Sequence, residues 1–108
     1  MASFARLVRC VYDGATMERF RLRVHYSGRV QGVGFRYNAK SVARGYDVLG
    51  TVCNLPDGRV ELIAEGTREE LEAFCAGIRE SGVGGLIRKE DASWSPATGG
   101  LRGFEIVG

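Results

Sequence analysis

The sequence predicts an α+β fold, in which one antiparallel sheet is covered on one face by two helices. Two segments carry apolar residues at helical spacing, and they are interspersed with segments whose apolar residues fall at every second position. A Pro-Asp-Gly turn joins two of these strand-like segments into a hairpin. The length of 108 residues suits one domain with a modest core.

The first half of the predicted fold begins with a strand over residues 21–26. Its apolar face consists of Leu22, Val24 and Tyr26. A glycine-rich loop over residues 27–34 follows, and the next segment is predicted to be helical. Its apolar positions are Phe35, Ala39, Val42 and Ala43. Gly45 is expected to end this helix as a C-terminal cap.

The second half begins with a predicted strand over residues 46–54. The turn at residues 55–58 contains Pro56-Asp57-Gly58 and leads into a third strand over residues 59–65. Thr67 and Glu70 have the spacing of a capping box, which predicts the start of a second helix. The apolar stripe of that helix is Leu71, Phe74, Cys75 and Ile78.

Glycines at positions 82, 84 and 85 end the second helix, and two more strands are expected over residues 86–94 and 104–107. Two strand-helix-strand units joined by a hairpin describe the ferredoxin-like split βαβ sandwich. This domain is expected to span residues 21–108. Residues 1–20 form an N-terminal extension of unknown role, in which residues 4–12 suggest an extra strand and Met17 an alternative translation start.

Composition excludes several classes of function. The net charge of +2, with basic and acidic residues interleaved, argues against a dedicated nucleic-acid-binding protein. No apolar run reaches the length of a membrane span, and no signal-peptide pattern is present. Three widely spaced cysteines are typical of reduced cytoplasmic thiols. We therefore expect a cytoplasmic monomer that binds neither nucleic acid nor membrane.

The glycine-rich loop is the first candidate for a functional site. Gly28, Gly32 and Gly34 lie between a strand and a helix, where backbone amides and the helix dipole favour an anion. A simple turn is the alternative interpretation of these glycines. The spacing matches neither a Walker loop nor the G-x-G-x-x-G pattern.

Arg36 lies in the first turn of the predicted helix, where a positive charge opposes the helix dipole. Such local conflicts tend to occur at functional sites. A guanidinium directed back at the loop would bind phosphate oxygens in bidentate fashion. The alternative is an ordinary surface arginine.

Asn54 ends the second predicted strand. In a split βαβ fold the first and second strands run in the same direction, so Asn54 is expected at the same edge as the glycine loop. Its amide both donates and accepts hydrogen bonds, which suits the binding of a water molecule. The alternative is that Asn54 only initiates the turn that follows.

Together these residues resemble the signature of the acylphosphatase family. The matching segments are Gly28-Arg29-Val30-Gln31-Gly32-Val33-Gly34-Phe35-Arg36 and Asn54-Leu55-Pro56-Asp57-Gly58. The resemblance implies a ferredoxin-like fold and the hydrolysis of acyl phosphates. It implies that Arg36 and Asn54 are catalytic, with Arg36 binding phosphate and Asn54 orienting water. It also implies a phosphate loop formed by Gln31, Gly32, Val33, Gly34, Phe35 and Arg36.

No cluster of residues has the spacing of a metal site, and His25 is the single histidine, so no cofactor or metal is expected. Activity then has to come from positioning and charge alone, which suits phosphoryl transfer. Three alternatives stay open: an RNA-binding sheet, a small-ligand regulatory domain, and an acylphosphatase-like module without activity. An RNA-binding sheet needs exposed aromatic residues, whereas Glu61 and Glu65 are expected on the exposed face.

Overall fold

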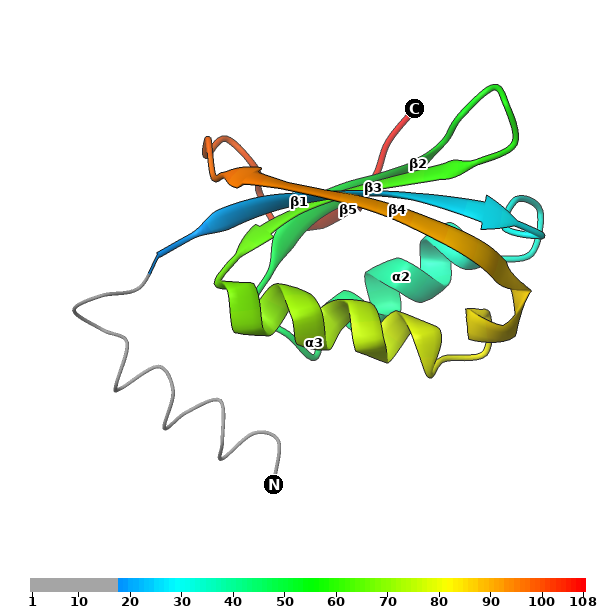
Figure 1. Ribbon diagram of the computed structural model, residues 1–108, viewed down its shortest axis with the longest axis horizontal. Coiled ribbons are helices and arrows are strands. Elements are labelled where there is room, and N and C mark those ends of the chain that lie inside the picture. The colour runs from blue at the N-terminus through cyan, green and yellow to red at the C-terminus, as the bar shows by residue number, and fades with distance from the viewer. Residues whose placement is uncertain (1–17) are drawn as a thin grey trace.

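A computed structural model describes residues 18–108 of the chain (Figure 1). The predicted strand at residues 4–12 and the alternative start at Met17 lie outside these residues. The described part forms a single layer of strands packed against a single layer of helices (Figure 1).

The sheet has five strands in the order β4-β1-β3-β2-β5. Their bounds are β1 Phe20–Gly28, β2 Leu49–Asn54, β3 Val60–Gly66, β4 Ile87–Pro96 and β5 Phe104–Ile106. β1 pairs antiparallel with both β3 and β4, and β3 pairs antiparallel with β2. β1 and β2 therefore run in the same direction on either side of β3, as a split βαβ fold requires.

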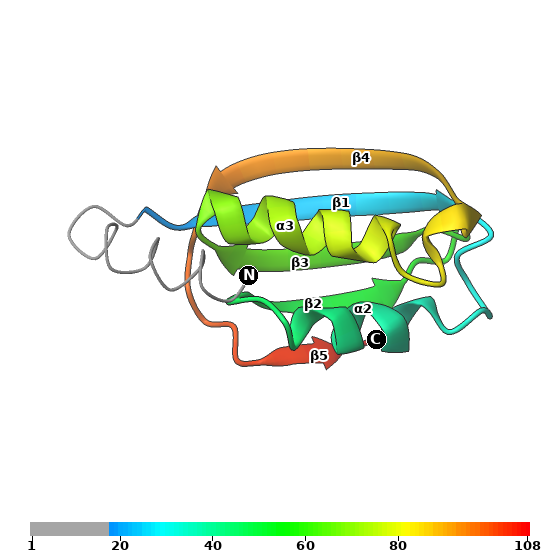
Figure 2. The same cartoon turned by 90° about the horizontal axis from the view of Figure 1, so that it is seen from below.

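Two α-helices, α2 (Phe35–Ala43) and α3 (Arg68–Arg79), lie on the same face of this sheet in the described part of the chain (Figures 1 and 2). A short 3₁₀ helix, η1 (Gly84–Leu86), connects α3 to β4. The predicted fold class, a ferredoxin-like sandwich with both helices on one face, is confirmed. None of the helices formed by residues 18–108 lies on the opposite face of the sheet.

The pairing of β5 differs from the purely antiparallel sheet that we expected. β5 pairs with β2 in parallel register, with Gly50 opposite Phe104 and Val52 opposite Ile106. The segment between β4 and β5 crosses to the far edge of the sheet at the end where β2 begins. β5 therefore starts at the same end as β2, and the two strands run alongside each other (Figure 2). The sheet is therefore mixed.

The core lies between the sheet and the helices. The predicted stripe of α3 is buried as expected, with Leu71, Phe74 and Ile78 fully enclosed. In α2 the buried residues are Phe35 and Ala39 together with Ala43, while Val42 packs at the edge of the core. Thr67 caps α3, since its hydroxyl accepts a hydrogen bond from the Glu70 backbone N–H (3.3 Å).

The boundary between α2 and β2 differs from prediction. β2 begins at Leu49 and not at residue 46, because Gly45 and Tyr46 continue the helical turn through hydrogen bonds from their N–H groups to carbonyls of α2. Gly45 is also not a left-handed cap, since its φ is not positive. Arg44, in the right-handed region, caps the helix through its backbone.

Glu65 is buried, although strand alternation predicted it on the exposed face. It is 3% exposed because residues 97–100 fold over it. Its carboxylate accepts hydrogen bonds from the Thr98 and Gly99 backbone N–H groups and from Arg21 Nε (2.8 Å). Burial alone would raise the pKa of Glu65, but these hydrogen bonds and the charge of Arg21 hold it below its usual value.

Replacing Gly50 with alanine is expected to destabilise the fold. An added Cβ would collide with the Ile63 backbone oxygen and would lie 2.9 Å from the Phe104 ring. Overpacking of this kind costs about 1–3 kcal/mol. Chemical denaturation measures the effect, with Gly82→Ala as the control because a Cβ there meets open space at an ordinary φ. Equal stability of the two variants would show that β2 and β5 adapt freely to the added carbon.

Candidate active site

The predicted site residues come together at one end of the sheet. Figure 2 shows that the loop after β1, the carboxyl end of β2 and the start of α2 all lie at this end. Arg36 is the second residue of α2 and Asn54 is the last residue of β2. Strand alternation puts Asn54 on the same side of the sheet as the buried Val52, which is the side that carries α2. Both side chains therefore belong to one end and one side of the sheet.

The loop between β1 and α2 is anchored by its two apolar residues. Val30 and Phe35 are each 1% exposed, and the Phe35 ring packs on Tyr26 of β1, with the ring centroids 4.9 Å apart. Between these anchors, Gly32 and Gly34 have φ values of 74° and 82°, a region that favours glycine. The loop thus has a fixed path, while its residues 32–34 are exposed to solvent.

The start of α2 is suited to an anion. Gly34 is its N-cap and provides no side-chain cap, and the first turn contains no acidic residue. The first helical hydrogen bond runs from the Asn38 N–H to the Gly34 carbonyl (2.9 Å). The amides of Phe35, Arg36 and Tyr37 precede that bond, so they remain available as donors at the positive end of the helix dipole.

Arg36 has no partner within the described residues. The residue is half-buried, and no hydrogen bond or ion pair from residues 18–108 engages its guanidinium. Its charge nevertheless acts at the end of β2. Burial and the Glu61 carboxylate raise the pKa of Cys53, the neighbour of Asn54, while the Arg36 charge lowers it. A cation and backbone amides in one helical turn, all without partners among residues 18–108, are groups that suit an anion.

Asn54 also has an unsatisfied group. Its Oδ1 is buried, and no donor among the described residues hydrogen bonds to it. A buried acceptor without a partner costs about 1–3 kcal/mol, so such atoms usually have a functional reason. Water is a donor of suitable size for this oxygen.

The turn after Asn54 forms without the Asn54 side chain. Its backbone hydrogen bonds run from the Leu55 N–H to the Arg59 carbonyl and from the Gly58 N–H to the Leu55 carbonyl. The side chain that stabilises the turn is Asp57, whose Oδ1 accepts from the Arg59 N–H (3.1 Å). Turn initiation therefore does not explain why an asparagine occupies position 54.

Gln31, which we expected in the phosphate loop, turns its side chain toward this same turn. Its Nε2 donates to the Leu55 carbonyl (2.8 Å) and to the Arg59 carbonyl (2.9 Å). No local sequence signal indicates these contacts, because they join segments more than twenty residues apart. They tie the loop after β1 to the turn after β2.

Comparison with known proteins decides the family. The model of the acylphosphatase family matches residues 22–106. An acylphosphatase from Acidothermus cellulolyticus is 42% identical over 85% of this chain and 90% of its own length. One from Thermococcus kodakarensis is 39% identical over 85% of this chain and all of its own length. The crystal structure of an acylphosphatase from Bacillus subtilis superposes with a TM-score of 0.75 at 34% identity, covering 82% of this chain and 98% of that one.

The chain belongs to the acylphosphatase family. It is a hydrolase that acts on acyl phosphates. The acylphosphatase signature in the sequence therefore coincides with the loop, the helix start and the end of β2 described above.

The geometry supports no role in acylphosphatase chemistry for Cys53 and Cys75, the two cysteines within the described residues. Both are free thiols. Burial raises the pKa of Cys75 to about 11, so its thiol stays protonated and packs in the core. Cys53 is half-buried on the opposite side of β2 from Asn54, and its raised pKa likewise disfavours the thiolate.

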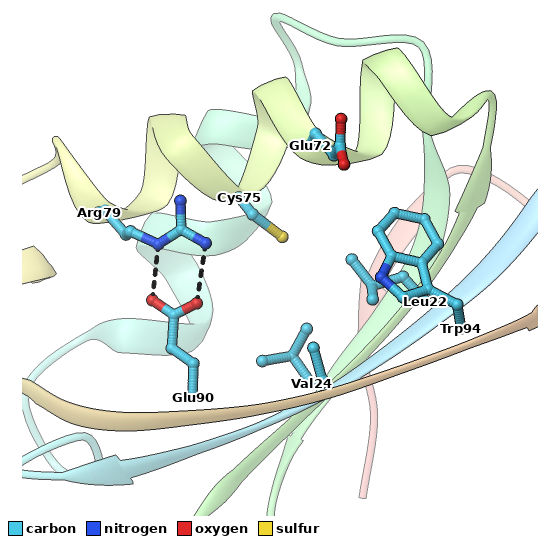
Figure 3. A pocket seen from close by; sticks show the side chains of 8 residues that line it. Leu22, Val24, Glu72, Cys75, Arg79, Glu90 and Trp94 are labelled. Carbon is cyan, nitrogen blue, oxygen red and sulfur yellow. Dashed lines mark hydrogen bonds and ion pairs between the residues drawn. The ribbon is translucent and has the colours of Figure 1, made fainter.

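A cavity of about 360 Å³ lies between α3 and the β1–β4 edge of the sheet, and none of the predicted acylphosphatase site residues lines it (Figure 3). Its floor is apolar, and an ion pair between Arg79 and Glu90 (2.9 Å) closes one side (Figure 3). The lining residues are Leu22, Val24, Glu72, Cys75, Arg79, Glu90, Ala92 and Trp94. Trp94 thus faces the helix layer, where the Arg68 guanidinium lies 4.3 Å from its ring centroid.

Within residues 18–108, no three or more His, Cys, Asp or Glu side chains are grouped so as to hold a metal ion. Over the same residues, no helix has both the length and the apolar character needed to cross a membrane.

Proposed function

We propose that this acylphosphatase binds the phosphoryl group of its substrate with the loop of residues 31–36 and positions the attacking water with Asn54. One observation carries the proposal: the Arg36 guanidinium, the first amides of α2 and the buried Asn54 Oδ1 lie at the same end of the sheet, and none of them has a partner among residues 18–108. Each of these groups is open to an external partner. A bound phosphoryl group and a water molecule would together provide those partners.

Arg36 supplies the charge in this proposal. Its planar guanidinium donates two parallel hydrogen bonds to phosphate oxygens, while the amides of Gly32, Val33, Gly34, Phe35 and Arg36 point at the remaining oxygens. Charge-assisted hydrogen bonds of this kind are roughly twice as strong as neutral ones. Because the buried Val30 and Phe35 hold the loop in place, its amides need little reorganisation when charge builds up on the phosphoryl oxygens.

Asn54 supplies the orientation. Its buried Oδ1 accepts a hydrogen bond from water and so directs an oxygen lone pair of that water at phosphorus, opposite the leaving carboxylate. The new bond joins the water oxygen to phosphorus, and the bond from phosphorus to the acyl oxygen breaks. An acyl phosphate dianion and one water become one carboxylate and one dihydrogen phosphate, so both protons of the water stay on the phosphate.

The small number of residues suits this reaction. A carboxylate is a good leaving group, so no strong general acid is needed to protonate it. Positioning and charge stabilisation then account for most of the catalysis. His25, the single histidine of the chain, is not required as a base in this scheme.

The open face of the sheet supports a small-molecule substrate over RNA. On this face β1 carries Arg21, Arg23 and His25, where an RNA-binding sheet carries stacking aromatics. Arg59 Nη1 donates to His25 Nδ1 (2.9 Å), so His25 Nε2 carries the hydrogen that it donates to Glu61 (2.8 Å). These polar groups are thus engaged with one another. We propose a monomer that acts on a small acyl phosphate.

Release of inorganic phosphate from benzoyl phosphate, with the full chain and no added metal, tests the proposed function. The expected result is saturable turnover that inorganic phosphate inhibits competitively, since product and substrate share the phosphoryl site. A chain without turnover would be an acylphosphatase-like module that has lost activity.

Extensive treatment with a chelator should leave this turnover unchanged. Arg36 and the loop amides provide the positive charge that a divalent ion supplies in many other phosphoryl-transfer enzymes. The measurement compares initial rates before and after dialysis against excess EDTA. Loss of activity that a divalent cation restores would mean that a metal ion takes part.

A further inference from the structure

The Gln31 side chain holds together the two parts of the candidate site. It is half-buried and reaches from the phosphate loop to the turn after Asn54, where Nε2 lies 2.8 Å from the Leu55 oxygen and 2.9 Å from the Arg59 oxygen. The hydrogen bonds span 24 and 28 residues of sequence. They directly link the segment that carries Arg36 to the segment that carries Asn54.

The two carbonyls that accept from Gln31 are at the base of the β2–β3 turn. The Arg59 carbonyl also accepts from the Leu55 N–H (2.8 Å), and the Leu55 carbonyl also accepts from the Gly58 N–H (3.1 Å). A carbonyl oxygen has two lone pairs. Gln31 therefore takes the second position on each, and the turn directly after Asn54 is held from outside by the loop.

Counting donors excludes a contact between this side chain and phosphate. A glutamine amide has two N–H hydrogens, and two carbonyls use both of them. The amide orientation is fixed by its partners, because a carbonyl oxygen cannot donate to Oε1. The remaining Oε1 is an acceptor and repels a phosphate oxygen. Gln31 can reach the phosphoryl group only through its backbone N–H.

We propose that Gln31 is a positioning residue for acyl phosphate hydrolysis, which sets the distance between the phosphate loop and Asn54. This inference rests on the function proposed above. Phosphate is bound by the loop and water by Asn54, so in-line attack requires the two segments to keep a fixed separation. The two hydrogen bonds of Gln31 fix that separation.

Two substitutions of Gln31 test this role: both should lower kcat, but they should respond differently to pH. Gln31→Ala removes both hydrogen bonds, and a misplacement of about 1 Å costs on the order of 10²-fold in rate. Gln31→Glu puts an ionised carboxylate against two carbonyl oxygens and should lower kcat further at neutral pH. Protonation of Glu at position 31 restores one donor, and the facing carbonyls favour that neutral form. The kcat of Gln31→Glu relative to wild type should therefore rise as the pH is lowered, whereas the ratio for Gln31→Ala should stay flat.

Asn38→Ala is the matched control. Asn38 is also a half-buried amide side chain that joins two segments, but its Nδ2 donates to Ser81 Oγ (2.7 Å), which lies after α3. The variant loses a comparable hydrogen bond away from the loop and the turn. It should keep its kcat and its affinity for inorganic phosphate, even where its thermal stability falls.

The experiment measures kcat, KM and thermal unfolding of wild type and the three variants across pH, with benzoyl phosphate. A lower kcat in folded Gln31 variants, with the acid recovery confined to Gln31→Glu, supports the inference. Unchanged kcat, or losses that only follow the unfolded fraction, would overturn the role of Gln31 while the proposed function stands. Inactive wild-type protein would overturn the proposed function and this role together.

Discussion

Arg36→Ala should abolish turnover and phosphate binding without unfolding the protein. The substitution removes a guanidinium that no described residue engages, so the described part of the fold loses no ion pair. It also removes a cation from the positive end of the helix dipole, which should leave the stability of α2 unchanged or slightly higher. Removing a comparable arginine from phosphoryl-transfer sites costs on the order of 10³-fold or more in rate. Steady-state turnover and thermal unfolding of the same sample measure both effects.

Two controls separate charge from geometry at this position. Arg36→Lys keeps the positive charge but lacks the planar fork, so it should restore little activity. Arg44→Ala removes an exposed arginine from the other end of α2 and should retain near-normal turnover. Near-normal turnover of Arg36→Ala itself would mean that the phosphate is bound elsewhere.

Asn54→Ala should lower kcat on the order of 10²-fold or more, since it removes a contact made to the attacking water. Interactions realised mainly in the transition state appear in kcat and not in substrate binding. Inorganic phosphate should therefore still inhibit or bind with similar affinity. Because the Asn54 oxygen is buried without a protein partner in the described residues, removing it should not destabilise the fold.

The competing interpretation, that Asn54 only supports the turn, predicts the reverse. The melting temperature would then fall, and the folded fraction would keep most of its activity. The structure argues against this outcome, because the turn hydrogen bonds use backbone groups and Asp57. A destabilised variant with intact turnover would nevertheless contradict the assignment of Asn54.

Much of the fold could be predicted from the sequence, because its signals are local. Alternation over β1, the apolar stripe of α3 and the Thr67 cap all depend on residues close together in the chain. The parallel pairing of β5 was missed because a three-residue strand does not encode its neighbour. Burial of Glu65 was missed for a similar reason, since the loop that covers it comes more than thirty residues later.

The residues of the candidate site also differ in how far the sequence predicts their roles. Arg36 and Asn54 could be proposed from sequence because they belong to a specific run of residues and because a charge at that helix position is locally unfavourable. The side-chain role of Gln31 could not, because it depends on how the loop and the turn meet in space. Strand direction predicted that the two segments share an end of the sheet, but not which side chain joins them.

Isothermal titration calorimetry with inorganic phosphate tests most directly whether Arg36 binds phosphate and Asn54 does not. The proteins to compare are wild type, Arg36→Ala and Asn54→Ala. It requires no turnover, so it compares an active protein with two variants whose turnover is expected to be strongly reduced or lost. We expect wild type and Asn54→Ala to bind phosphate with similar affinity and Arg36→Ala not to bind it measurably. Phosphate binding by Arg36→Ala at wild-type affinity would mean that Arg36 does not bind the phosphoryl group.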